Sequence, residues 1–513
     1  MRRDLAIAFS LANICYLRIW SELLTYRWSD AYLMKLPPGP ADYAAVMVNV
    51  LILALVLFGL VTLARRYLSK RAFMLVEVAF LLFLALPLNA IRSVLSNRFP
   101  YLKSPLFAVL GTRGVALLAL TIACAGLFIA VRYHRRAAHI AGSILVAVLP
   151  FCAITFAQAI WKAAHYNPTA YASRPLEPLL AAHGKTPRVL WFICDEWDYR
   201  LTFVDRNPAI PMPEIDRLRS VSLFADHAHP PGPETPISLP GYFTGRLVKS
   251  VEYDGPRELQ VTYRGAGHAV PWSRQPNVFE SAYGMGFNTA LVGWFHPGCR
   301  ILNGLTFCEW WELAMQHNSM GHTFGTILPD QTRSLFETTL FSPFGQSLSL
   351  HQHIGVYHDI LNTGLSIATD PKYGFMVVHL PIPHAPNIYD PRTGQFTLSN
   401  SPIHGYWGNL ALLDRTVGVF RHAMKAAGTW DNTVVLFTSD HPYRESEALD
   451  GKSDPRIPYI LKMASQENGI VYSQPFNAIL TEDLLLAVLR GEVSTPADAA
   501  GWLDRNRTRV PVN

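Results

Sequence analysis

The chain has 513 residues, of which half are hydrophobic and only 16% are charged, and its mean hydropathy is +0.16. This composition excludes a disordered or fibrous protein, and the length exceeds the roughly 100 to 200 residues of one ordinary domain. The net charge of +6 is too thinly spread to indicate a nucleic-acid partner, and six cysteines without a CxxC pair exclude a disulfide-dense scaffold. We therefore expect at least two structural units, one of them integral to a membrane.

Apolar segments long enough to cross a bilayer, which takes about 20 residues each, concentrate before residue 165. The five candidates are Leu5–Leu24, Tyr43–Leu63, Ala72–Ile91, Leu106–Val131 and Ile140–Trp161. A cleaved signal peptide is the alternative for the first segment, but no small-residue cleavage site is evident there. The sequence thus predicts a transmembrane helical domain of about five helices over residues 1–161.

Basic residues gather before the first segment, between the second and third, and between the fourth and fifth, and they predict the orientation of these helices. They are Arg2, Arg3, Arg65, Arg66, Lys70, Arg71, Arg132, Arg135 and Arg136. Cytoplasmic loops retain Lys and Arg during insertion. We expect a multi-pass protein of a bacterial inner membrane whose part after Trp161 is periplasmic or extracellular. Glu77, inside the third segment, is either functional or bonded to a neighbouring helix within the bundle.

Residues 162–186 are polar and contain proline, which is typical of a linker. From residue 187 the pattern of apolar and polar residues changes. Continuous apolar runs at 189–194, 288–294, 375–380 and 433–438 alternate with helical patterns at 216–224, 410–427 and 480–489. Such runs are typical of strands buried on both faces of a mostly parallel sheet. Residues 187–513 therefore predict a doubly wound α/β domain with helices on both faces.

Acidic and imidazole side chains follow the ends of the predicted strands. Asp195 and Glu196 follow the first run, Asp440 and His441 follow the last, and His384 lies just beyond the third. Ligands gather beyond the carboxyl ends of strands in open α/β sheets. An ordinary turn would explain one such pair alone, but several together predict one divalent metal, Zn²⁺ first, with Mn²⁺, Mg²⁺ or Ca²⁺ as alternatives.

Thr235 is the candidate nucleophile. It precedes Pro236 in a proline-rich loop, where the two residues are placed to act as N-cap and first residue of a short helix. Backbone N–H groups at a helix start favour a bound phosphate or sulfate, and a nearby cation would lower the pKa of the hydroxyl. A purely structural cap is the alternative for this residue.

The order of these elements resembles the alkaline phosphatase superfamily, and in particular its sulfatase-like branch. The resemblance covers residues 187 to about 465 and is carried by ICDEW, MPEIDRLRSVSLFADHAH, a threonine nine residues before TGR, HLPIPHAP and SDH. It implies that Asp195 or Glu196, together with Thr235, Asp440 and His441, binds the metal. It also implies that His384 holds phosphoryl oxygens or assists the leaving group. Lys452, in GKSDPRIP, would bind an anion, with a solvated loop lysine as the alternative.

Sulfatases proper oxidise a Cys or Ser of a C/S-x-P-x-R signature to formylglycine, whereas this chain has TPISL and threonine cannot form that aldehyde. The chain is therefore more similar to membrane-anchored phosphoethanolamine and phosphoglycerol transferases. That resemblance implies a membrane lipid donor and an envelope lipid or glycan acceptor. It departs at Pro442, where the family continues with glycine. A hydrolase using the same site and a non-catalytic lipid sensor are the alternatives.

Other polar residues remain weaker candidates. Cys299 and Cys308 are expected to form a disulfide in an outward-facing domain. His351, His353 and His358 lack carboxylates at ligand spacing, so we expect no second metal there. A substrate role for His296 stays open.

Overall fold

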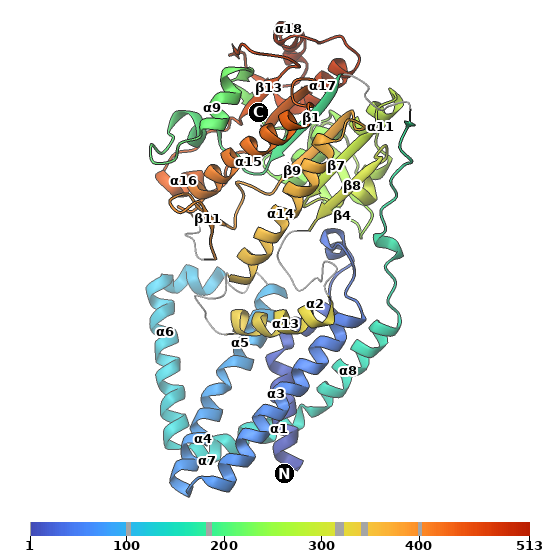
Figure 1. The fold of residues 1–513 in the computed structure, drawn as a ribbon. Helices are drawn as coiled ribbons and strands as arrows, with labels where there is room; N and C mark the ends of the chain where they lie inside the picture. The colour runs from blue at the N-terminus through green and yellow to red at the C-terminus, as the bar shows by residue number, and fades with distance from the viewer. Residues whose placement is uncertain are drawn as a thin grey trace. The chain divides into compact units, whose positions relative to one another are not determined.

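The computed structural model describes residues 2–98, 104–180, 187–312, 323–339, 347–398 and 403–512 and separates into two compact units (Figure 1). The helical unit comprises Met1–Arg27, Leu36–Pro168 and Gln316–Leu348, and the α/β unit comprises Trp28–Lys35, Thr169–Met315 and Ser349–Asn513. Two short segments thus interrupt these ranges: each belongs to one unit, although the residues before and after it in the sequence belong to the other. One is Trp28–Lys35, and the other is Gln316–Leu348.

The helical unit is built on a core shared by helices from both ends of its sequence. Its helices are α1 (Arg2–Cys15), α2 (Leu17–Leu24), α3 (Pro40–Tyr67), α4 (Lys70–Phe83), α5 (Ala85–Arg98), α6 (Ser104–Arg132), α7 (His134–Ala147), α8 (Leu149–Ala164) and α13 (Phe324–Thr339). Tyr16, Trp20, Tyr43 and Ala159 pack together in that core. Helix α13 lies on α3, where Asn49 Nδ2 donates a hydrogen bond of 3.0 Å to the Leu328 carbonyl.

Among the described residues, three helical stretches are long and apolar enough to cross a membrane: Pro40–Tyr67, Arg71–Arg92 and His134–Ala164. Helices α1 and α2 would make a fourth span if taken together, but they are bent by 59° at the break between them. For the predicted segment Leu106–Val131, the apolar helix found among the described residues is Leu120–Arg132, so this span stays a prediction. The five predicted spans are therefore not confirmed, whereas three of the predicted segments coincide with these stretches.

Glu77 lies within one of these stretches and is bonded to another helix. Its Oε2 lies 2.6 Å from Nδ1 of His134, at the first position of α7. Both side chains are largely buried. Of the two interpretations of Glu77, the bond to a neighbouring helix is therefore the one that the structure contains.

The α/β unit contains an eight-stranded sheet in the order β14-β2-β13-β12-β1-β9-β7-β8. These strands are β1 (Arg188–Cys194), β2 (Leu223–Ala225), β7 (Thr289–Trp294), β8 (Phe307–Trp311), β9 (Phe375–Leu380), β12 (Thr433–Ser439), β13 (Tyr459–Lys462) and β14 (Ile470–Tyr472). Strand β13 pairs antiparallel with both neighbours, and the other pairs are parallel. The mostly parallel sheet is confirmed, and the four predicted runs match β1, β7, β9 and β12 within one residue at each end.

Helices cover both faces of the sheet because its central strands are apolar on both sides. The covering helices are α9 (Pro213–Ser220), α10 (Thr235–Thr244), α11 (Val278–Gly284), α14 (Ser347–Thr369), α15 (Tyr406–Ala426), α17 (Thr481–Leu489) and α18 (Pro496–Asn506). Trp191 of β1 packs with α10, α11 and α17 in one core, whereas Phe192 faces Phe420 of α15 with ring centroids 4.6 Å apart. The helix predicted at 216–224 is corrected: it runs from Pro213 to Ser220, and its expected end forms strand β2.

Small sheets and short helices complete this unit. They are β3 (Ala228–His229), β4 (Val248–Tyr253), β5 (Leu259–Tyr263), β6 (Val270–Pro271), β10 (Tyr389–Asp390), β11 (Gln395–Phe396), β15 (Phe476–Asn477), α12 (Gly298–Ile301) and α16 (Ser446–Asp450). Within the predicted linker, residues 181–186 lie outside the described residues. Before that gap, the Leu176 N–H donates a hydrogen bond of 2.7 Å to the Leu305 carbonyl, so this stretch runs along the α/β unit.

Candidate active site

The ends of two neighbouring strands bring two aspartates together. Strands β1 and β12 pair in parallel with Cys194 opposite Ser439, so the residues that follow, Asp195 and Asp440, leave the sheet side by side. The Ser439 hydroxyl donates to the Cys194 carbonyl at 2.8 Å and accepts from the Trp197 N–H at 2.9 Å. The turn after β1 is therefore bonded directly to the end of β12.

Helix α10 brings Thr235 to the same place. The helix begins at Thr235, one residue earlier than the sequence predicts, and Glu234 is its N-cap. Two turns further on, the Tyr242 hydroxyl donates 2.8 Å to the Ser439 carbonyl, which ties the helix to β12. The start of α10 thus lies beside the two aspartates.

The Thr235 hydroxyl contacts three of the predicted metal ligands. Its Oγ1 donates to Asp440 Oδ2 at 2.6 Å and lies 3.2 Å from Asp195 Oδ2 and 3.3 Å from His441 Nε2. All four side chains are buried. Residues separated by more than 200 positions in the chain therefore meet around one hydroxyl oxygen.

The donor set fits a divalent metal. Ligand atoms of Asp195, Asp440 and His441 all lie within 4.8 Å of one another, and Asp195 Oδ1 is buried without a hydrogen-bond partner. Burial, reinforced by the charge of Asp440, raises the pKa of Asp195 well above its ordinary value. Two buried carboxylates at this distance need a positive charge to remain ionised, and a metal bound by these residues would supply it.

His379 is a further imidazole beside this group. Its Nδ1 lies 3.0 Å from the Trp294 carbonyl, and its Nε2 lies 3.7 Å from Asp195 Oδ2 with no hydrogen-bond partner. The bond to the carbonyl places the proton on Nδ1, so Nε2 presents its lone pair toward the aspartate side of the site. His379 can therefore add a nitrogen donor to the set.

Glu196 is placed differently from its neighbour. Its backbone has a φ of 62°, uncommon outside glycine, and its Oε1 accepts a hydrogen bond of 2.5 Å from Arg444 Nε. Glu196 is not part of the group of possible ligands that contains Asp195. The left-handed turn separates the two carboxylates, and Glu196 forms an ion pair with Arg444, so its ligand role stays a prediction.

Arg444 joins Glu196 to His384. Its Nη2 lies 3.1 Å from His384 Nε2, and His384 Nδ1 is hydrogen-bonded to the Ala385 carbonyl. Burial lowers the pKa of His384, which favours the neutral ring that this pattern requires. Arg444 itself is exposed, so a cation stands at the open edge of the site.

Lys452 does not join this arrangement. Its ammonium is exposed and pairs with Asp205 Oδ2 at 3.1 Å, and its backbone carbonyl accepts from Arg200. The predicted role in anion binding is therefore not supported by its contacts, because the side chain is committed to a carboxylate elsewhere. Arg444, three residues after His441, is instead the basic residue that lies at the site.

Tyr32 and His296 form a chain of hydrogen bonds that ends at the backbone carbonyl of Thr235. His296 Nε2 lies 3.3 Å from the Thr235 carbonyl, and its Nδ1 lies 2.6 Å from the Tyr32 hydroxyl. Burial lowers the pKa of His296 to about 3, so the ring is neutral. A neutral ring that donates from Nε2 must accept at Nδ1, and the tyrosine is the donor that this requires.

The remaining candidate residues make contacts that stabilise the fold. Cys299 and Cys308 form the expected disulfide. His353 is buried and bonded to the Pro381 carbonyl, and among the described residues no group of possible metal ligands forms around it, His351 or His358. Sequence reasoning misses Tyr32 and Arg444, although the spacing of Arg444 from the SDH motif is a signal that could have found it.

Comparison with known proteins decides the family. The model of the Sulfatase family matches residues 187–489, which is more than half of the chain. The chain belongs to the sulfatase family. The predicted sulfatase-like resemblance is therefore confirmed, and the protein is an enzyme of this superfamily, whose members use a metal.

Individual relatives of this sulfatase-family enzyme are distant. The ulvan-active sulfatase of Formosa agariphila is 27% identical over 103 residues, which span 18% of this chain and 19% of that relative. The PsFucS1 sulfatase from Pseudoalteromonas sp. shares 16% identity over 60% of this chain and 68% of that one, with a TM-score of 0.40. The lipoteichoic acid synthase LtaP from Listeria monocytogenes shares 13% identity over 61% of this chain and 73% of that one, with a TM-score of 0.37.

Proposed function

We propose that this sulfatase-family enzyme transfers a phospho-alcohol group from a membrane phospholipid to an envelope lipid or glycan, with Thr235 as the nucleophile. The observation that carries the proposal is the 2.6 Å hydrogen bond from the Thr235 hydroxyl to Asp440, within the buried group of Asp195, Asp440 and His441. The candidate membrane spans of the N-terminal helices favour a lipid donor. We place the enzyme in a bacterial inner membrane with its α/β unit in the periplasm or outside the cell.

The residue at the nucleophile position favours phosphoryl transfer over sulfate ester hydrolysis. A formylglycine sulfatase requires cysteine or serine at that position, and the β-methyl group of Thr235 prevents formation of the aldehyde. A hydroxyl can still attack phosphorus directly when a neighbouring group takes its proton. In this site Asp440 Oδ2 already accepts that proton in a hydrogen bond.

The reaction has two steps. In the first, Thr235 Oγ1 forms a bond to phosphorus, the bond from phosphorus to diacylglycerol oxygen breaks, and one proton moves from the threonine to the departing alcohol. In the second, an acceptor hydroxyl oxygen forms a bond to phosphorus, the bond from phosphorus to Thr235 Oγ1 breaks, and the acceptor's proton moves to the threonine. Arg444 lines the exposed edge, where its guanidinium N–H groups are placed to hold phosphoryl oxygens, and His384 Nε2 accepts a hydrogen bond from it there.

A divalent cation held by Asp195, Asp440 and His441, for which we propose Zn²⁺, supplies the Lewis acidity that lowers the pKa of the hydroxyl and offsets developing negative charge. The chain's own contribution is orientation: the bonds of Tyr242 to β12 and of His296 to the Thr235 carbonyl hold the first turn of α10 in place. Such positioning supplies most of the acceleration in phosphoryl transfer.

Turnover of a headgroup-labelled phospholipid by the purified enzyme tests the proposal. Transfer predicts that diacylglycerol appears together with labelled glycan or lipid acceptor. Release of free phospho-alcohol despite excess acceptor would instead show a hydrolase. Thr235→Ala should lower turnover by at least about 10³-fold. Thr244→Ala, at the far end of the same helix, where the hydroxyl donates to the Pro240 carbonyl, is the matched control and should stay near the wild-type rate.

A further inference from the structure

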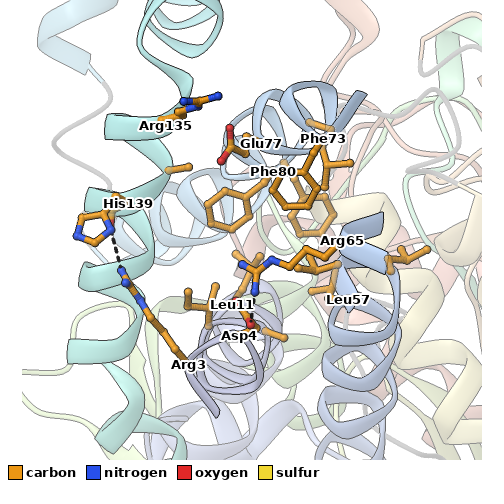
Figure 2. Close-up of a pocket in the computed structure, with 18 residues that line it drawn as sticks. Arg3, Asp4, Leu11, Leu57, Arg65, Phe73, Glu77, Phe80, Arg135 and His139 are labelled. Carbon is orange, nitrogen blue, oxygen red and sulfur yellow. Dashed lines mark hydrogen bonds and ion pairs between the residues drawn. The ribbon is translucent and has the colours of Figure 1, made fainter. Parts of the chain in front are cut away.

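The helical unit contains a cavity of about 410 Å³ that the proposed reaction does not use (Figure 2). It lies between α1, α3, α4 and α7, and its residues all belong to this unit, whereas the Thr235 group belongs to the α/β unit. Its volume falls within the range of about 300 to 1,000 Å³ of small-molecule sites. The cavity is therefore large enough to take part of a ligand.

One end of the cavity is charged. Arg3 and Asp4 lie in the first turn of α1, Arg65 in the last turn of α3 and Arg135 in the first turn of α7, and Figure 2 shows their side chains around the cavity with Glu77. Three guanidinium groups thus face two carboxylates. The lining has an excess of positive charge.

The contacts among these residues leave guanidinium groups available. Asp4 pairs with Arg65 at 2.5 Å, and Glu77 is bonded to His134. Arg3 Nη2 lies 3.3 Å from His139 Nδ1, 3.4 Å from the His139 carbonyl and 3.1 Å from Ser143 Oγ. The ion pairs of the described residues engage neither Arg3 nor Arg135.

The rest of the lining is apolar. Leu11 and Leu57 each lie eight residues from the arginine at the end of their helix, which is about 12 Å along the helix axis. Val61, Phe73 and Phe80 extend the same wall. The cavity therefore has a cationic end and an apolar depth, as a molecule with an anionic head and a hydrocarbon chain requires.

We propose that this cavity binds one anionic phospholipid, with its phosphate at Arg3, Arg65 and Arg135 and an acyl chain along Leu11, Leu57 and Phe80. Arginine forms paired hydrogen bonds with phosphate oxygens, and basic residues at helix ends attract anionic lipids. The ligand is a lipid rather than a free phosphate because the apolar wall would otherwise have no partner. The cavity is formed by the helical unit alone, so this proposal does not depend on the proposed reaction.

Native mass spectrometry of the full chain in detergent tests the proposal. Each protein carries Thr235→Ala so that no lipid is consumed, and the probes are phosphatidylglycerol and phosphatidylcholine with the same acyl chains. The starting protein should retain one phosphatidylglycerol at a concentration at least fivefold below that needed for phosphatidylcholine. Equal retention of the two lipids would overturn the proposal.

Three adjacent arginine pairs provide a matched control. Arg3→Gln, Arg65→Gln and Arg135→Gln together remove the lining charges, whereas Arg2→Gln, Arg66→Gln and Arg136→Gln remove the same charge from neighbours that do not line the cavity. The first triple variant should weaken phosphatidylglycerol binding at least tenfold, and the second should change it less than twofold. Equal loss of phosphatidylglycerol binding in both triple variants would show that the basic surface as a whole attracts the lipid. That result would contradict a specific site in the cavity.

A cavity-filling variant decides the question if the first triple variant does not fold. Ala138 lines the cavity on α7 and carries no charge. Ala138→Trp should displace the retained phosphatidylglycerol while all arginines remain. Retention of that lipid at the original affinity would overturn the proposal.

Discussion

The hydroxyl of Tyr32 lies 2.6 Å from Nδ1 of His296, 264 positions away in the chain, and the opposite nitrogen of the same ring lies 3.3 Å from the carbonyl of Thr235. Tyr32 and His296 are both buried. The tyrosine therefore selects the tautomer that donates to the backbone of the candidate nucleophile. Because Tyr32 belongs to the short segment Trp28–Lys35, that segment contributes to the candidate active site of the α/β unit.

Replacing Tyr32 with phenylalanine should lower kcat by about tenfold and leave KM nearly unchanged, because it removes one buried hydrogen bond, worth about 1 to 3 kcal/mol, behind the nucleophile. Kinetics with a labelled phospholipid donor measure both constants. Tyr253→Phe is the control, since Tyr253 stacks on the Tyr32 ring without bonding to His296. Wild-type kcat in Tyr32→Phe would contradict the positioning role.

Arg444 and Lys452 should differ in their importance for turnover. Arg444→Gln removes the partner of the buried Glu196 carboxylate and of His384, so we expect a loss of kcat/KM of about 100-fold or more. Lys452→Gln breaks only an exposed pair with Asp205 and should stay within about threefold of wild type. Steady-state kinetics of the two variants measure which residue matters more for turnover. A larger loss of kcat/KM in Lys452→Gln than in Arg444→Gln would restore the anion-binding role predicted for Lys452.

Removal of metal should both inactivate and destabilise the enzyme. Without a cation, the Asp195 and Asp440 carboxylates lie in one buried site, 3.5 to 3.7 Å from the ring nitrogens of His441 and His379. We expect the melting temperature to fall by more than about 5 °C after treatment with a chelator and to recover on addition of Zn²⁺. Asp440→Asn should abolish this response, and an unchanged melting curve of the wild-type protein on chelation would argue against a metal at these residues.

Glu482 should make stability depend on pH. Burial, followed by the charge of Asp483, raises the pKa of its carboxyl from 4.5 to about 8 in the folded protein. The folded state therefore holds the proton more tightly than the unfolded state, and the stability contributed by this group is lost as the pH rises from about 4.5 to 8.

Glu482→Gln should accordingly raise the free energy of unfolding at pH 9 by about 2 to 5 kcal/mol and change it little near pH 4, since one pKa unit corresponds to about 1.4 kcal/mol. Melting temperatures at pH 4, 7 and 9 check the trend. Glu492→Gln, at an exposed pair with Arg490, should show no such dependence. A Glu482→Gln curve parallel to that of the wild type at all three values would refute the shift.

The parts of the fold that local chemistry determines could be predicted from the sequence. Continuous apolar runs identify β1 and β12, and parallel pairing of neighbouring strands brings Asp195 and Asp440 to one edge of the sheet. Thr235 could be found because Pro236 marks a helix start. These predictions depend on residues close in sequence and on one general rule about sheets.

The rest depends on contacts between distant residues. Nothing near Tyr32 in the sequence indicates His296 as its partner, and the choice between Asp195 and Glu196 depends on a left-handed backbone turn at Glu196. The count of five spans is not confirmed, and hydropathy alone does not show the 59° bend between α1 and α2.

The most direct test of the central claim is peptide mass spectrometry of the purified enzyme after incubation with a phospholipid donor in the absence of acceptor. We predict a phospho-alcohol adduct on the peptide containing Thr235, which should disappear when acceptor is added and should be absent from Thr235→Ala. Continued turnover by Thr235→Ala, or an adduct on any other residue, would contradict the assignment of Thr235 as the nucleophile.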